Sequence, residues 1–62
     1  MKLYRLVDRY EGYFEFIYES NSLKKCKEYA NYYDNEVVGG ECYITLYKYD
    51  GQCYRIVKDW MY

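Results

Sequence analysis

Two glycine-containing turns, Tyr10-Glu11-Gly12 and Tyr49-Asp50-Gly51, constrain the fold of this 62-residue chain more than any other feature. Each turn lies between segments rich in aromatic and β-branched residues, which favour strands. An Asp-Gly or Glu-Gly turn between two such segments is typical of a β-hairpin. We therefore predict two hairpins, with strands over residues 2–10 and 13–19 in the first and over residues 41–48 and 52–60 in the second.

The length of each hairpin loop decides which side chains share a face of the sheet, because side chains alternate along a strand. With three-residue loops and glycine in the left-handed conformation, Leu6 pairs with Phe16 and Leu46 with Tyr54. A two-residue loop would bring Arg5 onto the face of Phe16 without an obvious partner for its charge. We therefore expect the longer loops, with Tyr4 opposite Tyr18, Ile44 opposite Ile56, and Phe14 and Phe16 facing the core.

One helix is expected in residues 20–35, between the two hairpins. Asn21 or Ser22 is suited to cap its start, because a side-chain oxygen there can accept a backbone N–H of the first turn. Asn35 is suited to a left-handed cap at its end. The apolar residues between them recur at helical spacing, and this stripe consists of Leu23, Cys26, Ala30 and Tyr33.

The order strand, strand, helix, strand, strand predicts a single α+β domain over residues 1–62. It has a four-stranded antiparallel sheet (ββαββ) with one helix packed on one face. Val37 and Val38 could begin the third strand. Because one helix covers one face only, the opposite face of the sheet is expected to lack intramolecular cover.

Tyrosine fills twelve positions of the chain, more aromatic surface than one small core can hold. Tyrosine combines an apolar ring with a hydroxyl that tolerates water, and it is enriched at protein interfaces. Tyr4, Tyr18, Tyr33 and Tyr54 are expected to flank the core. The uncovered face is expected to bind a protein partner or a second copy of the chain, with these contact residues: Arg5, Tyr13, Ile17, Tyr43, Tyr47, Arg55, Val57 and Trp60.

The sequence favours no catalytic, cofactor or metal site. Histidine is absent, which removes the commonest general base at neutral pH. The three cysteines form no C-x-x-C pair, and Cys26 lies on the apolar stripe of the helix. An odd number of thiols with no secretory segment predicts a reducing cytoplasm. No apolar run reaches membrane length, so no membrane partner is expected.

A single-stranded nucleic-acid binder is the alternative function. Tyr47-Lys48-Tyr49 and Tyr54-Arg55 interleave aromatic rings with cations, as base-stacking surfaces do. However, the net charge is −1, with 9 basic and 10 acidic residues, so phosphate contacts would be weak. The Gly-aromatic signature of RNA-recognition sheets is also absent. The sequence therefore favours a protein partner over a nucleic acid.

In overall character the chain resembles small accessory proteins encoded by bacteriophages and mobile elements. The features that carry the resemblance are one compact domain, abundant tyrosine, no targeting segment and no enzyme motif. The resemblance implies a non-enzymatic inhibitor that acts in the host cytoplasm by occluding a surface of host machinery, including nuclease-based defence. It assigns no functional residue.

Overall fold

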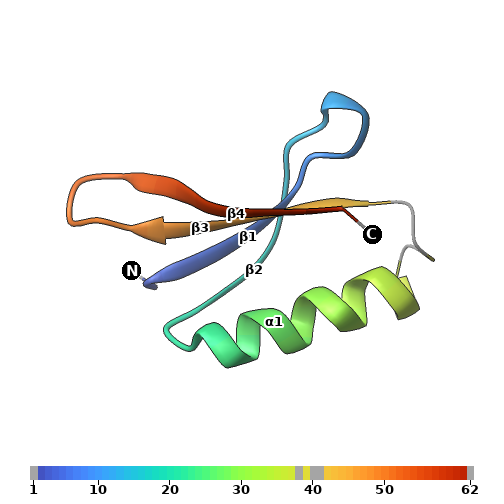
Figure 1. Cartoon of the computed structure of the whole chain (residues 1–62), viewed down its shortest axis with the longest axis horizontal. Helices are drawn as coiled ribbons and strands as arrows, with labels where there is room; N and C mark the ends of the chain where they lie inside the picture. Colours follow the sequence, from blue (N-terminus) through green and yellow to red (C-terminus); the bar gives the residue numbers. More distant parts are fainter. Residues whose placement is uncertain (1, 38, 40–41, 62) are drawn as a thin grey trace.

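The computed structural model describes residues 2–37, 39 and 42–61, with residues 59–61 described by their backbone. It confirms the α+β fold and the order of its elements (Figure 1). A short turn of 3-10 helix (Tyr10–Gly12) lies between the first two strands. The main elements are β1 (Tyr4–Asp8), β2 (Glu15–Ser20), α1 (Leu23–Tyr32), β3 (Tyr43–Tyr49) and β4 (Tyr54–Met61).

The four strands form one antiparallel sheet, as predicted. Their order in the sheet is β2-β1-β3-β4, and the sequence did not predict this order. The central strands β1 and β3 come from different hairpins, so their pairing joins the two halves of the chain. Helix α1 lies on one side of the sheet, and the loop between β1 and β2 rises on the other side (Figure 1).

Helix α1 begins where the sequence predicts and ends differently. The side chain of Ser22 accepts a hydrogen bond from the backbone N–H of Lys25 at 3.3 Å, so Ser22 is the N-cap. The predicted left-handed cap at Asn35 is wrong, because a π-helical turn (Tyr33–Val37) continues α1 through that position. Val37 therefore belongs to this turn rather than to the third strand, while Val38 lies outside the described residues.

The core lies between α1 and the central strands. Leu6, Ile44 and Leu46 point from β1 and β3 toward the helix and are fully or almost fully buried. Burying each such side chain contributes about 1.5–3 kcal/mol before the entropy cost is subtracted. The helix and the segments flanking it supply Cys26, Ala30, Tyr33 and Cys42 to the same cluster, and Tyr4, Ile17, Tyr18 and Tyr29 pack around it.

The predicted register of the first hairpin is wrong. Leu6 lies opposite Tyr18, and Tyr4 lies opposite Ser20. The loop runs from the end of β1 at Asp8 to the start of β2 at Glu15, longer than three residues. It includes two consecutive residues of positive φ, Glu11 and Gly12, so glycine has the predicted conformation inside a longer turn.

The predicted register of the second hairpin is also wrong. Leu46 lies opposite Lys58, and Ile44 lies opposite Trp60. The Asp50 carboxylate accepts hydrogen bonds from the backbone N–H groups of Gln52 and Cys53, at 2.9 and 3.0 Å. These bonds extend the turn to residues 50–53, so the first pair of the ladder is Tyr49 with Tyr54.

An irregularity in each hairpin shifts the register again partway along the strands. In β2 the shift leaves Ile17 outside the pairing, and in β4 it leaves Val57 outside. Residues expected to face α1 therefore lie on the opposite face. Phe16 is opposite Val7, Ile56 is opposite Tyr47, and both side chains are 51% exposed. The predicted placement of Phe16, Ile56 and Tyr54 toward the core is wrong.

Candidate protein-binding face

The sheet face opposite α1 is defined by residues that lie opposite one another in the ladder. Arg5 of β1 pairs with Tyr47 of β3, and Val7 pairs with Thr45. Residues directly opposite in an antiparallel pair project to the same face. Because Leu6 and Leu46 project into the core under α1, Arg5, Val7, Thr45 and Tyr47 project away from it.

Val7 and Thr45 are buried on this face without belonging to the core beneath α1. Their exposed fractions are 1% and 0%, and neither is part of the core cluster. Phe16, which lies opposite Val7, and Tyr47, which is two residues along β3 from Thr45, place rings next to them. The uncovered side of the sheet is therefore a second apolar layer formed by aromatic side chains.

Arg5 occupies the middle of this layer between two rings. Its guanidinium carbon lies 4.0 Å from the centre of the Tyr54 ring and 5.2 Å from that of Phe16. These distances are within the range of cation–π attraction. A terminal nitrogen of Arg5 also lies 3.3 Å from a carboxylate oxygen of Glu19, its partner in β2. Arg5 therefore connects β1 to both edge strands.

Tyr54 is held in place by contacts with β3 and with the segment that precedes β1. Its hydroxyl donates a hydrogen bond of 2.6 Å to the carbonyl of Lys2, just before β1. Its ring packs against that of Tyr49 with centres 5.3 Å apart. Since Tyr54 belongs to edge strand β4, its side chain spans β3 to reach the start of β1. The ring under Arg5 is therefore fixed before any partner binds.

Further exposed rings surround this arrangement. Phe14, 69% exposed, meets the ring of Tyr47 edge-on at 6.3 Å between centres. Such apolar groups lose contact with water only when another molecule covers them. We call the surface formed by these side chains the ring face, and it consists of Arg5, Phe14, Phe16, Tyr47, Tyr54 and Ile56.

The structure places three of the predicted contact residues on the face away from α1. Arg5, Tyr43 and Tyr47 project to that side, as the sequence predicts. Tyr13 precedes β2 and is 73% exposed. Val57, the residue left out of the ladder, is 55% exposed.

Two other predicted contact residues lie elsewhere. Ile17 packs against the core cluster instead of facing outward. Arg55 lies opposite Lys48, which in turn lies opposite the core-packed Tyr4, so Arg55 is on the α1 side of the sheet. Both placements follow from the corrected register. Trp60 is paired through its backbone with Ile44, and its side chain lies outside the described residues.

Sequence reasoning missed Phe14, Phe16, Tyr54 and Ile56 as members of the exposed face. The signal that could have found them is Arg5, which the sequence places at the centre of a strand. A cation there requires rings or a carboxylate as neighbours. The register with Arg5 beside Phe16 supplies both, through Phe16 and Glu19.

A buried polar network closes the sheet at the end of β1. Asp8 is 6% exposed, and one of its carboxylate oxygens accepts hydrogen bonds from the backbone N–H groups of Tyr10 and Tyr43. Its other oxygen accepts one from the Tyr33 hydroxyl at 3.0 Å. Burial, together with this hydrogen bond, raises the pKa of Tyr33. The network ties the first loop and the end of α1 to β3.

Cys42 extends this polar region. Its thiol donates a long hydrogen bond of 3.6 Å to the Asp34 carboxylate. Burial and the negative charge of Asp34 raise the pKa of Cys42 to about 11, so the group is a neutral thiol at neutral pH. Burial also raises the pKa of Cys26. These two cysteines are buried and Cys53 is exposed, and all three are free thiols.

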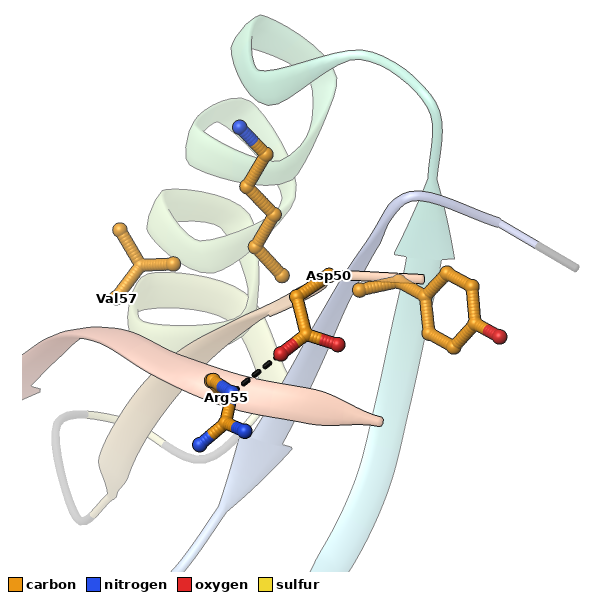
Figure 2. Close-up of a pocket in the computed structure, with 5 residues that line it drawn as sticks. Asp50, Arg55 and Val57 are labelled. Carbon is orange, nitrogen blue, oxygen red and sulfur yellow. Dashed lines mark hydrogen bonds and ion pairs between the residues drawn. The ribbon is translucent and has the colours of Figure 1, made fainter. Parts of the chain in front are cut away.

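A pocket with a volume of about 430 Å³ lies on the β3–β4 hairpin (Figure 2). Asp50 and Arg55 form an ion pair there through the Arg55 Nε, and Val57 lies further along β4. We call this site the hairpin pocket, and it is lined by Lys48, Tyr49, Asp50, Arg55 and Val57. The pKa of Asp50 is held well below its usual range by hydrogen bonds from the backbone N–H of Cys53, from the Arg55 side chain and from the backbone N–H of Gln52.

Across residues 2–37, 39 and 42–61, no group of three or more histidine, cysteine or carboxylate side chains could hold a metal ion. Within the same ranges, no helix has the length and apolar character needed to cross a bilayer. No family model, curated protein or solved structure matches this chain.

Proposed function

We propose that this chain is a non-enzymatic protein-binding module whose ring face is covered by a protein partner. The observation that carries the proposal is the exposure of large apolar side chains on one sheet face. Phe14, Phe16 and Ile56 remain 51–69% exposed on that face. Aromatic residues and arginine are the residue types enriched at binding hot spots.

Preorganisation of this face supports the proposal. Arg5 and Tyr54 are already held by ring contacts, an ion pair and a hydrogen bond. Little side-chain entropy remains to be lost when a partner binds, and this lowers the cost of association. The same face carries two buried polar atoms without a partner among the described residues, the Arg5 Nε and the Thr45 Oγ1.

The partner is a second copy of the chain or a protein of a host cell, on which the chain acts by occluding a surface. The small size of the domain supports self-association, because a second copy is one way for such a domain to bury more apolar area. Occlusion by a small domain also fits an inhibitor of phage or mobile-element type, the class that the chain resembles in overall character.

The test compares Phe16→Ala and Ile56→Ala with Tyr32→Ala. Tyr32 lies on α1 and is 52% exposed, so it matches the ring-face residues in exposure while lying outside the ring face. Sedimentation equilibrium measures self-association. Proteins retained on the immobilised chain are identified, purified and titrated to measure binding to a different partner. We expect each ring-face variant to weaken binding by about tenfold and Tyr32→Ala by less than about twofold.

Equal losses of affinity in all three variants would contradict the proposal. Undiminished binding by a variant that carries both Phe16→Ala and Ile56→Ala would also contradict it. The salt dependence of the affinity distinguishes protein binding from the alternative, single-stranded nucleic-acid binding. Binding through the ring face should change little from about 50 to about 200 mM salt, whereas affinity for single-stranded nucleic acid falls steeply over that range. A steep fall in affinity with added salt, together with a nucleic acid as the bound ligand, would show that the ring face binds nucleic acid and not a protein.

A further inference from the structure

Two cationic side chains on the α1 side of the sheet line the hairpin pocket. Lys48 of β3 and Arg55 of β4 lie directly opposite each other in the ladder and both line the pocket. Directly opposed side chains in an antiparallel pair are separated by about 5 Å at their Cβ atoms, and like charges there repel. An anion beside such a pair reduces this repulsion.

One of the two charges is compensated within the pocket. The Asp50 carboxylate pairs with the Nε of Arg55, and the same carboxylate accepts the backbone N–H groups of Gln52 and Cys53 (Figure 2). Both carboxylate oxygens are therefore engaged, one by the turn and the other by Arg55. Asp50 is also the only carboxylate among the residues that line the pocket.

Lys48 carries the other charge. Its side chain is exposed, and the contact found for it in the described part of the chain is with the ring of Tyr4, 5.9 Å from the ammonium nitrogen. No carboxylate of that part lies within ion-pair distance of Lys48. The pocket therefore has one carboxylate for two cations, with a net charge of +1.

We propose that the hairpin pocket binds an acidic peptide segment, with a carboxylate side chain at Lys48 and an adjoining apolar side chain against Val57. The single uncompensated charge matches one carboxylate better than a phosphate, which carries more negative charge at neutral pH. Val57 is 55% exposed and offers an apolar wall. The site lies outside the ring face, so this binding goes beyond the proposed function and does not depend on it.

The test is a titration of the ¹⁵N-labelled full chain with two capped dipeptides, acetyl-Glu-Leu-amide and acetyl-Gln-Leu-amide, followed by NMR. The glutamate peptide should shift the backbone amide signals of residues 48–57 in a saturable manner, and the glutamine peptide should bind more weakly by about twofold or more. Lys48→Gln should weaken binding of the glutamate peptide by a similar factor. Lys24→Gln, an exposed change of equal charge on α1, should leave binding unchanged.

Inorganic phosphate is titrated as a third probe. Saturable shifts at the same amides with phosphate, without shifts from the glutamate peptide, would overturn the assignment to a carboxylate. Absence of saturable shifts with every probe would overturn the site. Equal binding of both dipeptides, or equal losses in Lys48→Gln and Lys24→Gln, would show that Lys48 does not select the ligand and would also overturn the proposal. Circular dichroism checks that both variants remain folded.

Discussion

The guanidinium carbon of Arg5 lies 4.0 Å from the centre of the Tyr54 ring, joining β1 to β4 across β3. On its other side Arg5 reaches Phe16 and Glu19 of β2. One side chain thus contacts both edges of the sheet on the face that α1 leaves uncovered. This contact stabilises the fold and also shapes the surface proposed to bind a partner.

Replacing Arg5 by alanine should lower the free energy of unfolding by about 1–2 kcal/mol. The variant loses two ring contacts and an ion pair, which is partly screened because both of its side chains are 36% exposed. Urea unfolding followed by circular dichroism measures the change. Arg9→Ala, at an exposed residue of the first loop, is the control and should change stability by less than about 0.5 kcal/mol. If Arg5→Ala and Arg9→Ala lowered the free energy of unfolding equally, the ring contacts of Arg5 would not stabilise the fold.

Asp8→Ala should cost about 2–4 kcal/mol of stability. It removes the acceptor for the Tyr33 hydroxyl and for the backbone N–H groups of Tyr10 and Tyr43, in a site that is 6% exposed. Tyr33→Phe, which removes one of these donors, should cost about 1 kcal/mol. Thermal and urea unfolding provide the values. If Asp8→Ala cost no more than a change at exposed Glu28, the network would not stabilise the fold.

Stability should fall as the pH rises above about 9, with Cys42 as one cause. Burial and Asp34 raise the pKa of this thiol from 9.0 to about 11, so the unfolded chain loses its proton first. The contribution of Cys42 is complete below pH 9 and is lost between pH 9 and 11, with a size on the order of 2 kcal/mol. Under reducing conditions, Cys42→Ala should show a smaller fall than the unsubstituted chain. If the free energy of unfolding fell equally with pH in Cys42→Ala and in the unsubstituted chain, the assignment to Cys42 would be contradicted.

The Asp50 carboxyl should titrate at a lower pH than an ordinary aspartate. The N–H groups of Cys53 and Gln52 and the Arg55 side chain lower its pKa below the ordinary 3.8. Its contribution to stability is therefore present above pH 4 and is lost as the pH falls from there toward the lowered pKa. Carbon-13 NMR of the carboxyl group follows its titration, which Arg55→Ala should move toward the ordinary value. Titration near 3.8 in both proteins would exclude the ion pair.

The element order, the single helix and the start of α1 could be predicted from the sequence because each depends on local chemistry. Glycine in two turns, an apolar stripe at helical spacing and a serine cap act over a few residues. Ser22 caps the helix, and Gly12 and Gly51 have the positive φ values that their turns require. The expectation of a sheet face that the helix does not cover follows from having one helix, although Val7 and Thr45 on that face are buried within the chain itself.

The register could not be predicted, because side-chain hydrogen bonds set the loop lengths. Asp50 lengthens the second turn by accepting two backbone N–H groups, and Asp8 holds the first loop against β3. Local irregularities then leave Ile17 and Val57 out of the ladders. The sequence disfavours placing Arg5 on the face of Phe16 because no partner for its charge is obvious, yet Phe16, Tyr54 and Glu19 provide its partners.

Hydroxyl-radical footprinting of the chain, alone and bound, tests the ring face most directly. The bound form is the self-associated chain at high concentration or the complex with the identified partner. We predict that Phe14 and Phe16 lose most of their oxidation on binding, while Tyr32 on α1 is oxidised equally in both forms. Protection of Tyr32 with undiminished oxidation of Phe14 and Phe16 would place the partner on the helix and contradict the account.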